Sequence, residues 1–222
     1  MALDNMYGAE TWIFDLDNTL YPAACGLFRQ VERNMTRFIM DRLTLAYEDA
    51  YAIQKTYFRE HGTTMRGLMH HHAVDPADFL SYVHNIDLSP IPSNPDLDGL
   101  LSRLPGRKII FTNGSTGHAD NITRYMGIDH HFDAVFDIVA ADYVPKPELI
   151  VYEQLIESHA IDPSTTVMVE DMAKNLAPAA AIGMTTVWIE TDTTWGREHA
   201  ECDFVHHRAS DINAFLSDVV GP

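Results

Sequence analysis

The chain has 222 residues, of which 46 % are apolar and 21 % are charged, values that are ordinary for a globular protein with a hydrophobic core of its own. Its formal net charge of −17 argues against a nucleic-acid polymer as partner, because nonspecific binding to nucleic acids depends on Lys and Arg side chains at the phosphates. The charge does not argue against a small phosphorylated ligand, because a bound cation reverses the field inside a single pocket.

The sequence also limits the expected compartment. The two cysteines, Cys25 and Cys202, lie far apart and in no metal-ligand spacing, which favours a reducing cytoplasm over a disulfide framework. We expect both to be small buried apolar residues. The stretch MALDNMYGAE lacks the features of a signal peptide, and no apolar run approaches the roughly 18 residues of a membrane-spanning helix. We therefore expect a cytoplasmic protein without a membrane partner.

The first predicted strand, residues 11–16, is apolar but carries a carboxylate near its end. Asp15 and Asp17 are separated by one residue, and two like charges so close together are costly to bury unless something offsets them. A bound cation and a proton on one of the two carboxylates would together remove this repulsion.

Helical patterns follow the first strand. Two faces have helical spacing, and their members are Leu27, Val31, Met35, Phe38 and Ile39 on the first and Ala46, Ala50, Ile53 and Tyr57 on the second. Two shorter helices are predicted near 64–72 and 76–85. Asp75 is the expected N-cap of the second of these, with Pro76 at its first helical position.

A segment with three prolines, LSPIPSNPD at 88–96, ends the helical region. We predict that residues 22–90 form a helical insertion. Residues 1–21 and 91–222 then form the remaining domain.

The rest of the chain alternates between strands and helices. Short runs rich in β-branched and aromatic residues predict strands at 108–112, 134–140, 165–170 and 184–189. Near-continuous apolar strands separated by helices indicate an α/β fold whose parallel sheet is covered on both faces. A weaker strand at 203–207 and a final helix near 210–219 complete the prediction.

Polar side chains follow four of these strands. The groups are Asp15, Asp17 and Thr19 in the first, Thr112, Asn113 and Gly114 of FTNGS in the second, Lys146 of VPKPE in the third, and Glu170 and Asp171 of VEDMAKN in the fourth. Ligands of open parallel sheets bind at the carboxyl ends of the strands. Gly114 is expected to permit a tight turn there.

The residue types in these groups indicate phosphate chemistry. Carboxylates and a backbone carbonyl suit Mg²⁺, while a lysine, a threonine hydroxyl and backbone amides suit a phosphate. One carboxylate could attack phosphorus to form an aspartyl phosphate, and the second could protonate the leaving oxygen and then activate water. Each group alone is also typical of a turn, an exposed lysine or a helix N-terminus, so the combination carries the prediction.

The four motifs FDLDNT, FTN, the lysine of PKP, and VED resemble those of the haloacid dehalogenase superfamily. The resemblance covers essentially the whole chain and implies a Rossmann-like parallel sheet with an inserted helical cap of the first (C1) type. The second aspartate, Asp17, points to the phosphatase branches, because haloacid dehalogenases themselves lack an aspartate there.

The resemblance also implies roles for the acidic residues. Asp15 would be the nucleophile and a ligand of Mg²⁺. Asp17 would be the general acid and base, with its backbone carbonyl on the metal. Asp171 would bind the metal directly, and Glu170 would act through water.

The remaining motif residues are expected to hold the phosphoryl group. Thr112 and the backbone amide of Asn113 would contact its oxygens, and Lys146 would balance charge on the nucleophile and the phosphate. Thr19 and Gly114 complete the predicted phosphate-binding set.

A narrower resemblance concerns the substrate. LYP, the run EHGTTMRGLMHHHAVDPADFLSYVHNIDL and IIFTNGSTGHADNI are similar to the pyrimidine 5′-nucleotidase-like subfamily, which implies hydrolysis of nucleoside 5′-monophosphates. The loop around TTMRGLM, together with Ser115 and His118, is expected to contact the nucleoside. Met65, Leu68 and Met69 fit a core stripe better than a base pocket.

Two alternatives remain open at this stage. One is a phosphatase for another small phosphomonoester, such as phosphoglycolate or a sugar phosphate, and the other is a noncatalytic phosphate-binding regulatory protein. The paired histidines at 130–131 and 206–207 and the triplet at 70–72 have no Cys or acidic partner at metal spacing. We expect these histidines to be surface or interface residues.

Overall fold

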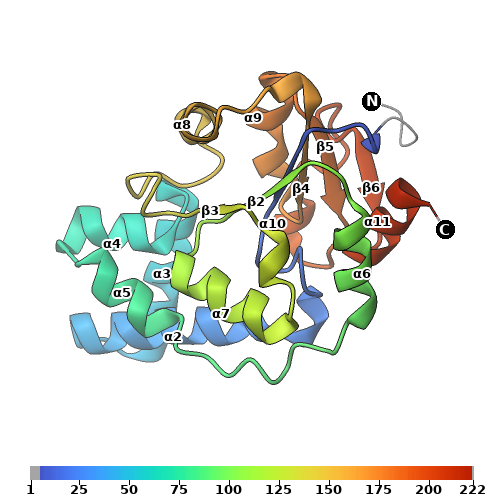
Figure 1. The fold of residues 1–222 in the computed structure, drawn as a ribbon. Helices are drawn as coiled ribbons and strands as arrows, with labels where there is room; N and C mark the ends of the chain where they lie inside the picture. The colour runs from blue at the N-terminus through green and yellow to red at the C-terminus, as the bar shows by residue number, and fades with distance from the viewer. Residues whose placement is uncertain (1–5, 222) are drawn as a thin grey trace.

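Six parallel strands form one sheet in the computed structural model, which describes residues 6–221 (Figure 1). The order is β3-β2-β1-β4-β5-β6, and every neighbouring pair is parallel. The α/β class predicted from the sequence is therefore confirmed. The strands are β1 (Thr11–Phe14), β2 (Arg107–Phe111), β3 (Ala134–Phe136), β4 (Thr166–Glu170), β5 (Thr185–Ile189) and β6 (His207–Ala209).

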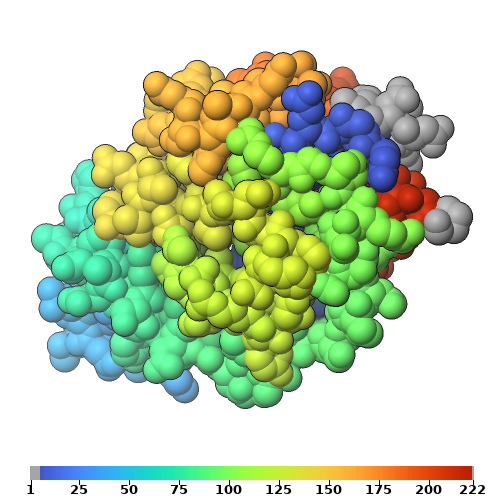
Figure 2. Space-filling model, in the orientation of Figure 1, coloured from blue at the N-terminus to red at the C-terminus, as the bar shows by residue number. Residues whose placement is uncertain are grey.

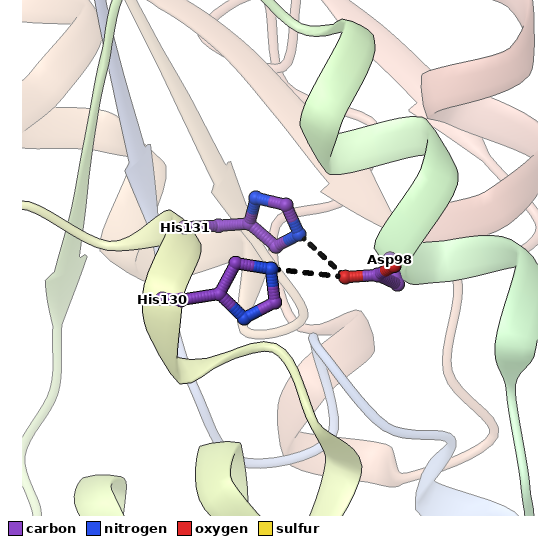
Figure 3. A group of neighbouring side chains, drawn as sticks. All are labelled: Asp98, His130 and His131. Carbon is purple, nitrogen blue, oxygen red and sulfur yellow. Dashed lines mark hydrogen bonds and ion pairs between the residues drawn. The ribbon is translucent and has the colours of Figure 1, made fainter.

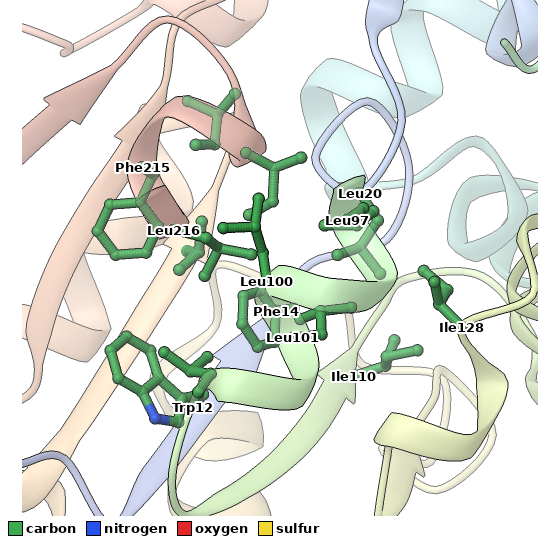
Figure 4. Packing of buried hydrophobic residues seen from close by; sticks show 14 of the residues in the cluster. Trp12, Phe14, Leu20, Leu97, Leu100, Leu101, Ile110, Ile128, Phe215 and Leu216 are labelled. Carbon is green, nitrogen blue, oxygen red and sulfur yellow. The ribbon is translucent and has the colours of Figure 1, made fainter. Parts of the chain in front are cut away.

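Helices cover both faces of the sheet, as the apolar strands predicted. Alternate residues of a strand point to opposite faces, so Trp12 and Phe14 of β1 join one core cluster while Ile13 joins the other. Figure 4 shows the first cluster, where residues of the sheet pack against two helices, α6 (Pro95–Arg103) and α11 (Ile212–Val220). The same face carries α7 (Thr116–Met126), and the opposite face carries α8 (Leu149–His159) and α9 (Leu176–Ala181).

Four helices between β1 and β2 form a third core cluster. They are α2 (Leu27–Leu43), α3 (Tyr47–His61), α4 (Thr64–His72) and α5 (Pro76–Val83), and a short turn, η1 (Ala23–Cys25), precedes them. They gather at one side of the molecule in Figure 1, and Figure 2 shows them against the yellow segment after β3. Ile138 of that segment is a buried member of the same cluster, and the partly buried Tyr143 packs against it.

Several local predictions within this helical region are confirmed. The Asp75 carboxylate accepts a hydrogen bond from the Ala77 amide at 2.8 Å, and Pro76 is the first residue of α5. Met65 and Leu68 are buried core residues, as the core-stripe interpretation required. The division of the chain into a core and a cap at residues 22–90 stays a prediction.

The strand predicted at 134–140 is shorter than expected, because Asp137 ends it. One Asp137 carboxylate oxygen accepts hydrogen bonds from the amides of Val139 and Ala140, and the other accepts from the amide and hydroxyl of Thr116. These bonds bend the backbone away from the sheet. They also tie the segment after β3 to the start of α7.

The strand predicted at 203–207 was misplaced, since β6 covers 207–209. Phe204 and Val205 pack on a core cluster from a turn rather than from a strand. Thr186 of β5 fixes this turn, because its hydroxyl donates to the Phe204 carbonyl and its amide donates to His206 Nδ1. The true edge strand is polar, so the apolar pattern did not reveal it.

The remaining elements are short connections: η2 (Asp129–His131), η3 (Pro163–Thr165), η4 (Ala173–Asn175) and α10 (Thr194–Arg197). Within residues 6–221, none of the helices has the length and apolar character needed to cross a membrane. Cys25 and Cys202 are free and only partly buried, which corrects the expectation that both would be buried.

Candidate active site

The predicted site residues converge where β1, β2 and β4 end. In the sheet, β1 lies between β2 and β4, and the chain crosses from one side of β1 to the other between β3 and β4. This reversal is the point at which open α/β sheets bind their ligands. Asp15 follows β1, Thr112 follows β2, and Glu170 ends β4; all three side chains are buried.

Lys146 lies at the centre of this group. Its Nζ donates to Asp15 Oδ1 at 2.8 Å, to Glu170 Oε2 at 2.7 Å and to the Phe111 carbonyl at 2.8 Å. Asn113 fixes the Lys146 backbone, because its Oδ1 accepts from the Lys146 amide at 2.9 Å. Burial alone would lower the pKa of Lys146, but the two carboxylates hold it above its ordinary value. Lys146 is therefore a fixed cation between the ends of β1 and β4.

We expect Lys146→Met to lower the free energy of unfolding by about 3 kcal/mol or more at pH 8, because it leaves two buried carboxylates without their partner. At pH 5 the loss should be smaller, since Asp15, whose pKa burial and Glu170 raise, then takes up a proton and leaves less uncompensated charge. Urea unfolding at both pH values measures the difference. Asn113→Ala, which removes the bond to the Lys146 backbone but keeps the charge, is the matched control. An equal loss at pH 5 and pH 8 would contradict this electrostatic account.

Three buried carboxylates form the acidic part of the site. Asp15, Glu170 and Asp171 each offer an oxygen, and the three atoms lie within 4.8 Å of one another. Burial and the charge of Glu170 raise the pKa of Asp15 to about 7, and burial with Glu170 and Asp15 raises the pKa of Asp171 well above its ordinary value. Lys146 alone does not neutralise this group. An all-oxygen set with excess negative charge fits a divalent cation such as Mg²⁺.

Asp17 has partners of its own, a tyrosine and a histidine. Tyr21 donates its hydroxyl to Asp17 Oδ1, and His118 Nε2 lies 2.9 Å from the same oxygen. Burial raises the pKa of Asp17, but the opposing effects of His118, Tyr21 and His84 are larger, and the net shift is downward. The two aspartates of the motif therefore have opposite environments, one holding a proton readily and the other held as a carboxylate.

His118 also connects the site to the helical region. Its ring stacks on His84 at the end of α5, with the ring centres 4.1 Å apart and the planes 13° apart. His84 Nδ1 lies 2.9 Å from the Ser115 hydroxyl. That hydroxyl caps the N-terminus of α7 by accepting a hydrogen bond from the His118 amide. In the structure Ser115 contacts His84 and His118 contacts Asp17, and their contact with a nucleoside stays a prediction.

The other predicted phosphate-binding residues support these groups. Thr19 donates its hydroxyl to Asp15 Oδ2 at 3.0 Å, so it orients the carboxylate. The Thr112 hydroxyl accepts from the Gly114 amide at 2.9 Å. Gly114 has no left-handed backbone conformation. The backbone bends at Asn113 and Gly114. A Cβ at Gly114 would lie 3.2 Å from both His118 and Thr112, so the glycine favours the close approach of these side chains.

Sequence reasoning missed four contributors to the site: Tyr21, His84, Asp137 and the carbonyl of Phe111. Tyr21 lies four residues after Asp17, a spacing that could have suggested a local contact. The contribution of His84 depends on packing between segments far apart in the chain. Asp137 acts through backbone hydrogen bonds, which leave no residue pattern.

The histidine clusters differ from one another. His61 and His71 lie 3.0 Å apart between their Nε2 atoms, and the Tyr57 hydroxyl lies 2.8 Å from His72 Nε2. The pair at 130–131 does have an acidic partner, Asp98, which the sequence places 32 residues upstream of His130. The statement that these histidines lack such a partner was therefore wrong for this pair.

Comparison with known proteins identifies the family. Residues 10–183 match the model of the haloacid dehalogenase-like hydrolases. The chain belongs to this family. As a haloacid dehalogenase-like hydrolase, it places its motif residues at the carboxyl edge of a parallel sheet.

A curated relative from yeast is distant in sequence. The chain is 25 % identical over 193 residues to phosphate metabolism protein 8 of Saccharomyces cerevisiae, a match that covers 79 % of this chain. The chain spans about 60 % of the length of that relative.

Solved structures share the fold of this hydrolase. CbbY from Rhodobacter sphaeroides, solved in complex with phosphate, has a TM-score of 0.62 at 16 % identity, covering 94 % of this chain and 95 % of that one. YfnB from Bacillus subtilis, solved with magnesium, has a TM-score of 0.60 at 13 % identity, covering 96 % and 99 %. L-2-haloacid dehalogenases are also among the similar structures.

Proposed function

We propose that this hydrolase is a Mg²⁺-dependent phosphomonoesterase that acts through an aspartyl phosphate on Asp15. The observation that carries the proposal is that the two aspartates of the first motif lie in different surroundings. Asp15 lies against Lys146 in an acidic cluster, and Asp17 is a separate carboxylate with a histidine partner. A dehalogenase would need the nucleophile but no second carboxylate for acid and base work.

The proposed reaction has two displacement steps at phosphorus. In the first, an Asp15 oxygen forms a bond to phosphorus, the ester P–O bond breaks, and the leaving oxygen takes a proton from the Asp17–His118 pair. In the second, that pair accepts a proton from water, the water oxygen bonds to phosphorus, and the bond to Asp15 breaks. The products are an alcohol and inorganic phosphate, and Asp15 and the Asp17–His118 pair return to their starting states.

The residues in the site fit a divalent cation. Asp15, Asp171 and Glu170 would hold it, together with the backbone carbonyl of Asp17, and when bound it would offset the negative charge of the phosphoryl group. Lys146, the Thr112 hydroxyl and the backbone amide of Asn113 would bind and orient phosphoryl oxygens. The relatives solved with phosphate and with magnesium and the curated relative named for phosphate metabolism support this proposal.

We expect Mg²⁺ to stabilise the folded protein more at pH 8 than at pH 5.5. Protons compete with the metal for Asp15 and Asp171, whose pKa values are raised in the folded state. In the metal-free protein the raised pKa of Asp15 means that stability falls as pH rises from about 4 to about 7, and Mg²⁺ should cancel part of this loss. At a metal concentration near 100 times Kd the gain is about 2.7 kcal/mol.

Thermal unfolding with MgCl₂ or EDTA at the two pH values checks the expectation. Asp98→Asn, a change in an acidic residue outside the site, is the control and should keep the full effect. A Mg²⁺ shift that is absent, or no larger at pH 8, would contradict the assignment of the cation to these carboxylates.

For the substrate we propose a nucleoside 5′-monophosphate, with a preference for pyrimidines, and residues 22–90 as the cap over the site. The support is the resemblance of the cap sequence and a hollow of about 480 Å³ between the helical region and the core. Arg66 of TTMRGLM and Lys174 line the hollow, as does Pro147 next to Lys146. Arg59 also lines the hollow, together with the carboxylates of Glu60 and Glu148, and Glu148 pairs with Arg66 at 3.4 Å. The three cations exceed the two carboxylates by one, which suits an anionic substrate in a chain of net charge −17.

Another small phosphomonoester is the second candidate, because Ser115 and His118 are already engaged by His84 and Asp17. A phosphate-release screen with Mg²⁺ over UMP, CMP, AMP, GMP, phosphoglycolate and sugar phosphates separates the two. We expect UMP or CMP to exceed the sugar phosphates by more than tenfold in kcat/KM, about 1.4 kcal/mol. A smaller preference would defeat the pyrimidine assignment, and release of halide from 2-chloropropionate without phosphate release would defeat the phosphatase.

A further inference from the structure

A second group of metal-binding residue types lies on the core domain away from the candidate active site. Asp98 of α6 faces His130 and His131 of η2, and both imidazole rings direct a nitrogen to the same carboxylate oxygen (Figure 3). The distances from Asp98 Oδ1 are 3.2 Å to His130 Nε2 and 2.8 Å to His131 Nε2. The three atoms lie within 4.8 Å of one another.

This group shares no residue with the acidic cluster of the candidate active site. The turn that follows η2 is bonded to the start of β2, where the Lys108 amide donates to Asp133 Oδ2 and the Asp133 amide donates to the Lys108 carbonyl. The group of Asp98, His130 and His131 therefore lies toward the amino end of the strands, whereas Asp15 and Glu170 lie at the carboxyl end. Any ligand bound here is distinct from the cation proposed for the active site.

Core packing holds both segments in place. Leu97 and Leu101 of α6 belong to the same buried cluster as Ile128, which precedes η2 (Figure 4), and Phe132 after η2 packs on that cluster with its ring edge-on to Phe14. The His131 side chain is only 10 % exposed. The three ligand atoms are thus presented by a fixed scaffold, which lowers the cost of ordering them on binding.

The spacing suits a tetrahedral transition metal. Two ligand atoms about 2.0 Å from a tetrahedral zinc ion lie about 3.3 Å apart, close to the two distances found here. The short η2 turn brings consecutive histidines to one side, with ring centres 4.0 Å apart, where a regular helix would direct them apart. Two imidazoles and one carboxylate favour Zn²⁺ over Mg²⁺, because nitrogen ligands suit transition metals.

We propose that Asp98, His130 and His131 bind a divalent transition-metal ion of the zinc class. His130 and Asp98 are 61 % and 52 % exposed, so the fourth position opens to solvent and takes a water. The ion joins α6 to the turn between α7 and β3, and it contributes to the stability of the core rather than to the chemistry at Asp15.

Zinc titration of the full chain tests the proposal. The protein is stripped with EDTA, exchanged into buffer with excess Mg²⁺, and titrated with Zn²⁺ by calorimetry and with Co²⁺ by visible absorption. His131→Gln, His130→Ala and Asp98→Ala should each remove one equivalent of bound metal relative to the wild type, or weaken its binding at least tenfold. His71→Ala, in the exposed cluster on α4, and Asp15→Asn are the controls and should keep this equivalent.

Thermal unfolding gives the second readout, because an ion that binds only the folded state raises the midpoint. Zn²⁺ should raise the midpoint of the wild type and not that of His130→Ala, a change at an exposed side chain that leaves the core intact. Equal zinc stoichiometry, affinity and thermal shift in the wild type and His130→Ala would overturn the proposal. So would the absence of any zinc equivalent that depends on Asp98.

Discussion

Asp15→Asn is expected to abolish phosphate release while leaving the fold intact. An amide has nearly the same shape as a carboxylate and still accepts a hydrogen bond from Lys146, but it is not an effective nucleophile toward phosphorus. We expect kcat to fall by about 10⁴-fold or more, which corresponds to about 5.5 kcal/mol of transition-state stabilisation. Steady-state phosphate release with Mg²⁺ measures the loss, and circular dichroism checks the fold.

Thr19→Val is the matched control for this experiment. It removes the hydrogen bond to Asp15 Oδ2 but keeps the nucleophile, so the loss should be about tenfold, the size of one positioning contact. Hydrolysis at the normal rate by Asp15→Asn, with the Asn confirmed by mass spectrometry, would refute the assignment of the nucleophile.

Asp17→Asn is expected to slow the reaction by roughly 10²–10⁴-fold, the usual contribution of a general acid or base. The loss should depend on the leaving group. An alkyl phosphate needs a proton on its leaving oxygen, whereas p-nitrophenyl phosphate releases a stable anion, so formation of the phosphoenzyme should be impaired less for the aryl substrate. Rapid-quench measurement of the first turnover with the two substrates gives the comparison.

His118→Ala should also slow the alkyl phosphate more than the aryl phosphate, but by a smaller factor than Asp17→Asn, because His118 acts through its contact with Asp17. Thr123→Ala, on the same helix and hydrogen-bonded to the Ala119 carbonyl, is a control for damage to α7 and should show no such pattern. Equal losses for the alkyl and aryl substrates in Asp17→Asn would contradict acid and base work by this residue.

The sequence was most informative where one short pattern carries both structure and chemistry. The apolar run before Asp15 and Asp17 predicted a core strand, and β1 indeed lies at the centre of the sheet. The prediction that Lys146, Thr112 and Glu170 would share one edge followed from the rule that parallel strands end together. The structure places them there.

Other features could not be predicted because they depend on contacts between distant segments. Stacking of His84 on His118 and the meeting of Asp98 with His131 leave no local pattern. The end of β3 at Asp137 was not predicted, because the apolar pattern continues past this residue. Asp137 ends the strand by accepting hydrogen bonds from backbone amides. The polar strand β6 was missed because it has no apolar pattern. The apolar residues just before it, Phe204 and Val205, pack on the core from a turn.

The central claim is that phosphorus becomes bonded to Asp15 during turnover. The most direct measurement is mass spectrometry of peptides from enzyme that has been mixed with Mg²⁺ and a substrate from the screen and then quenched in acid within the first turnover. The account predicts one added phosphoryl group on the peptide that contains Asp15, acid-stable but lost at alkaline pH, and none in Asp15→Asn. An unmodified Asp15 peptide at every quench time during active turnover, or a phosphoryl group on another residue, would contradict it.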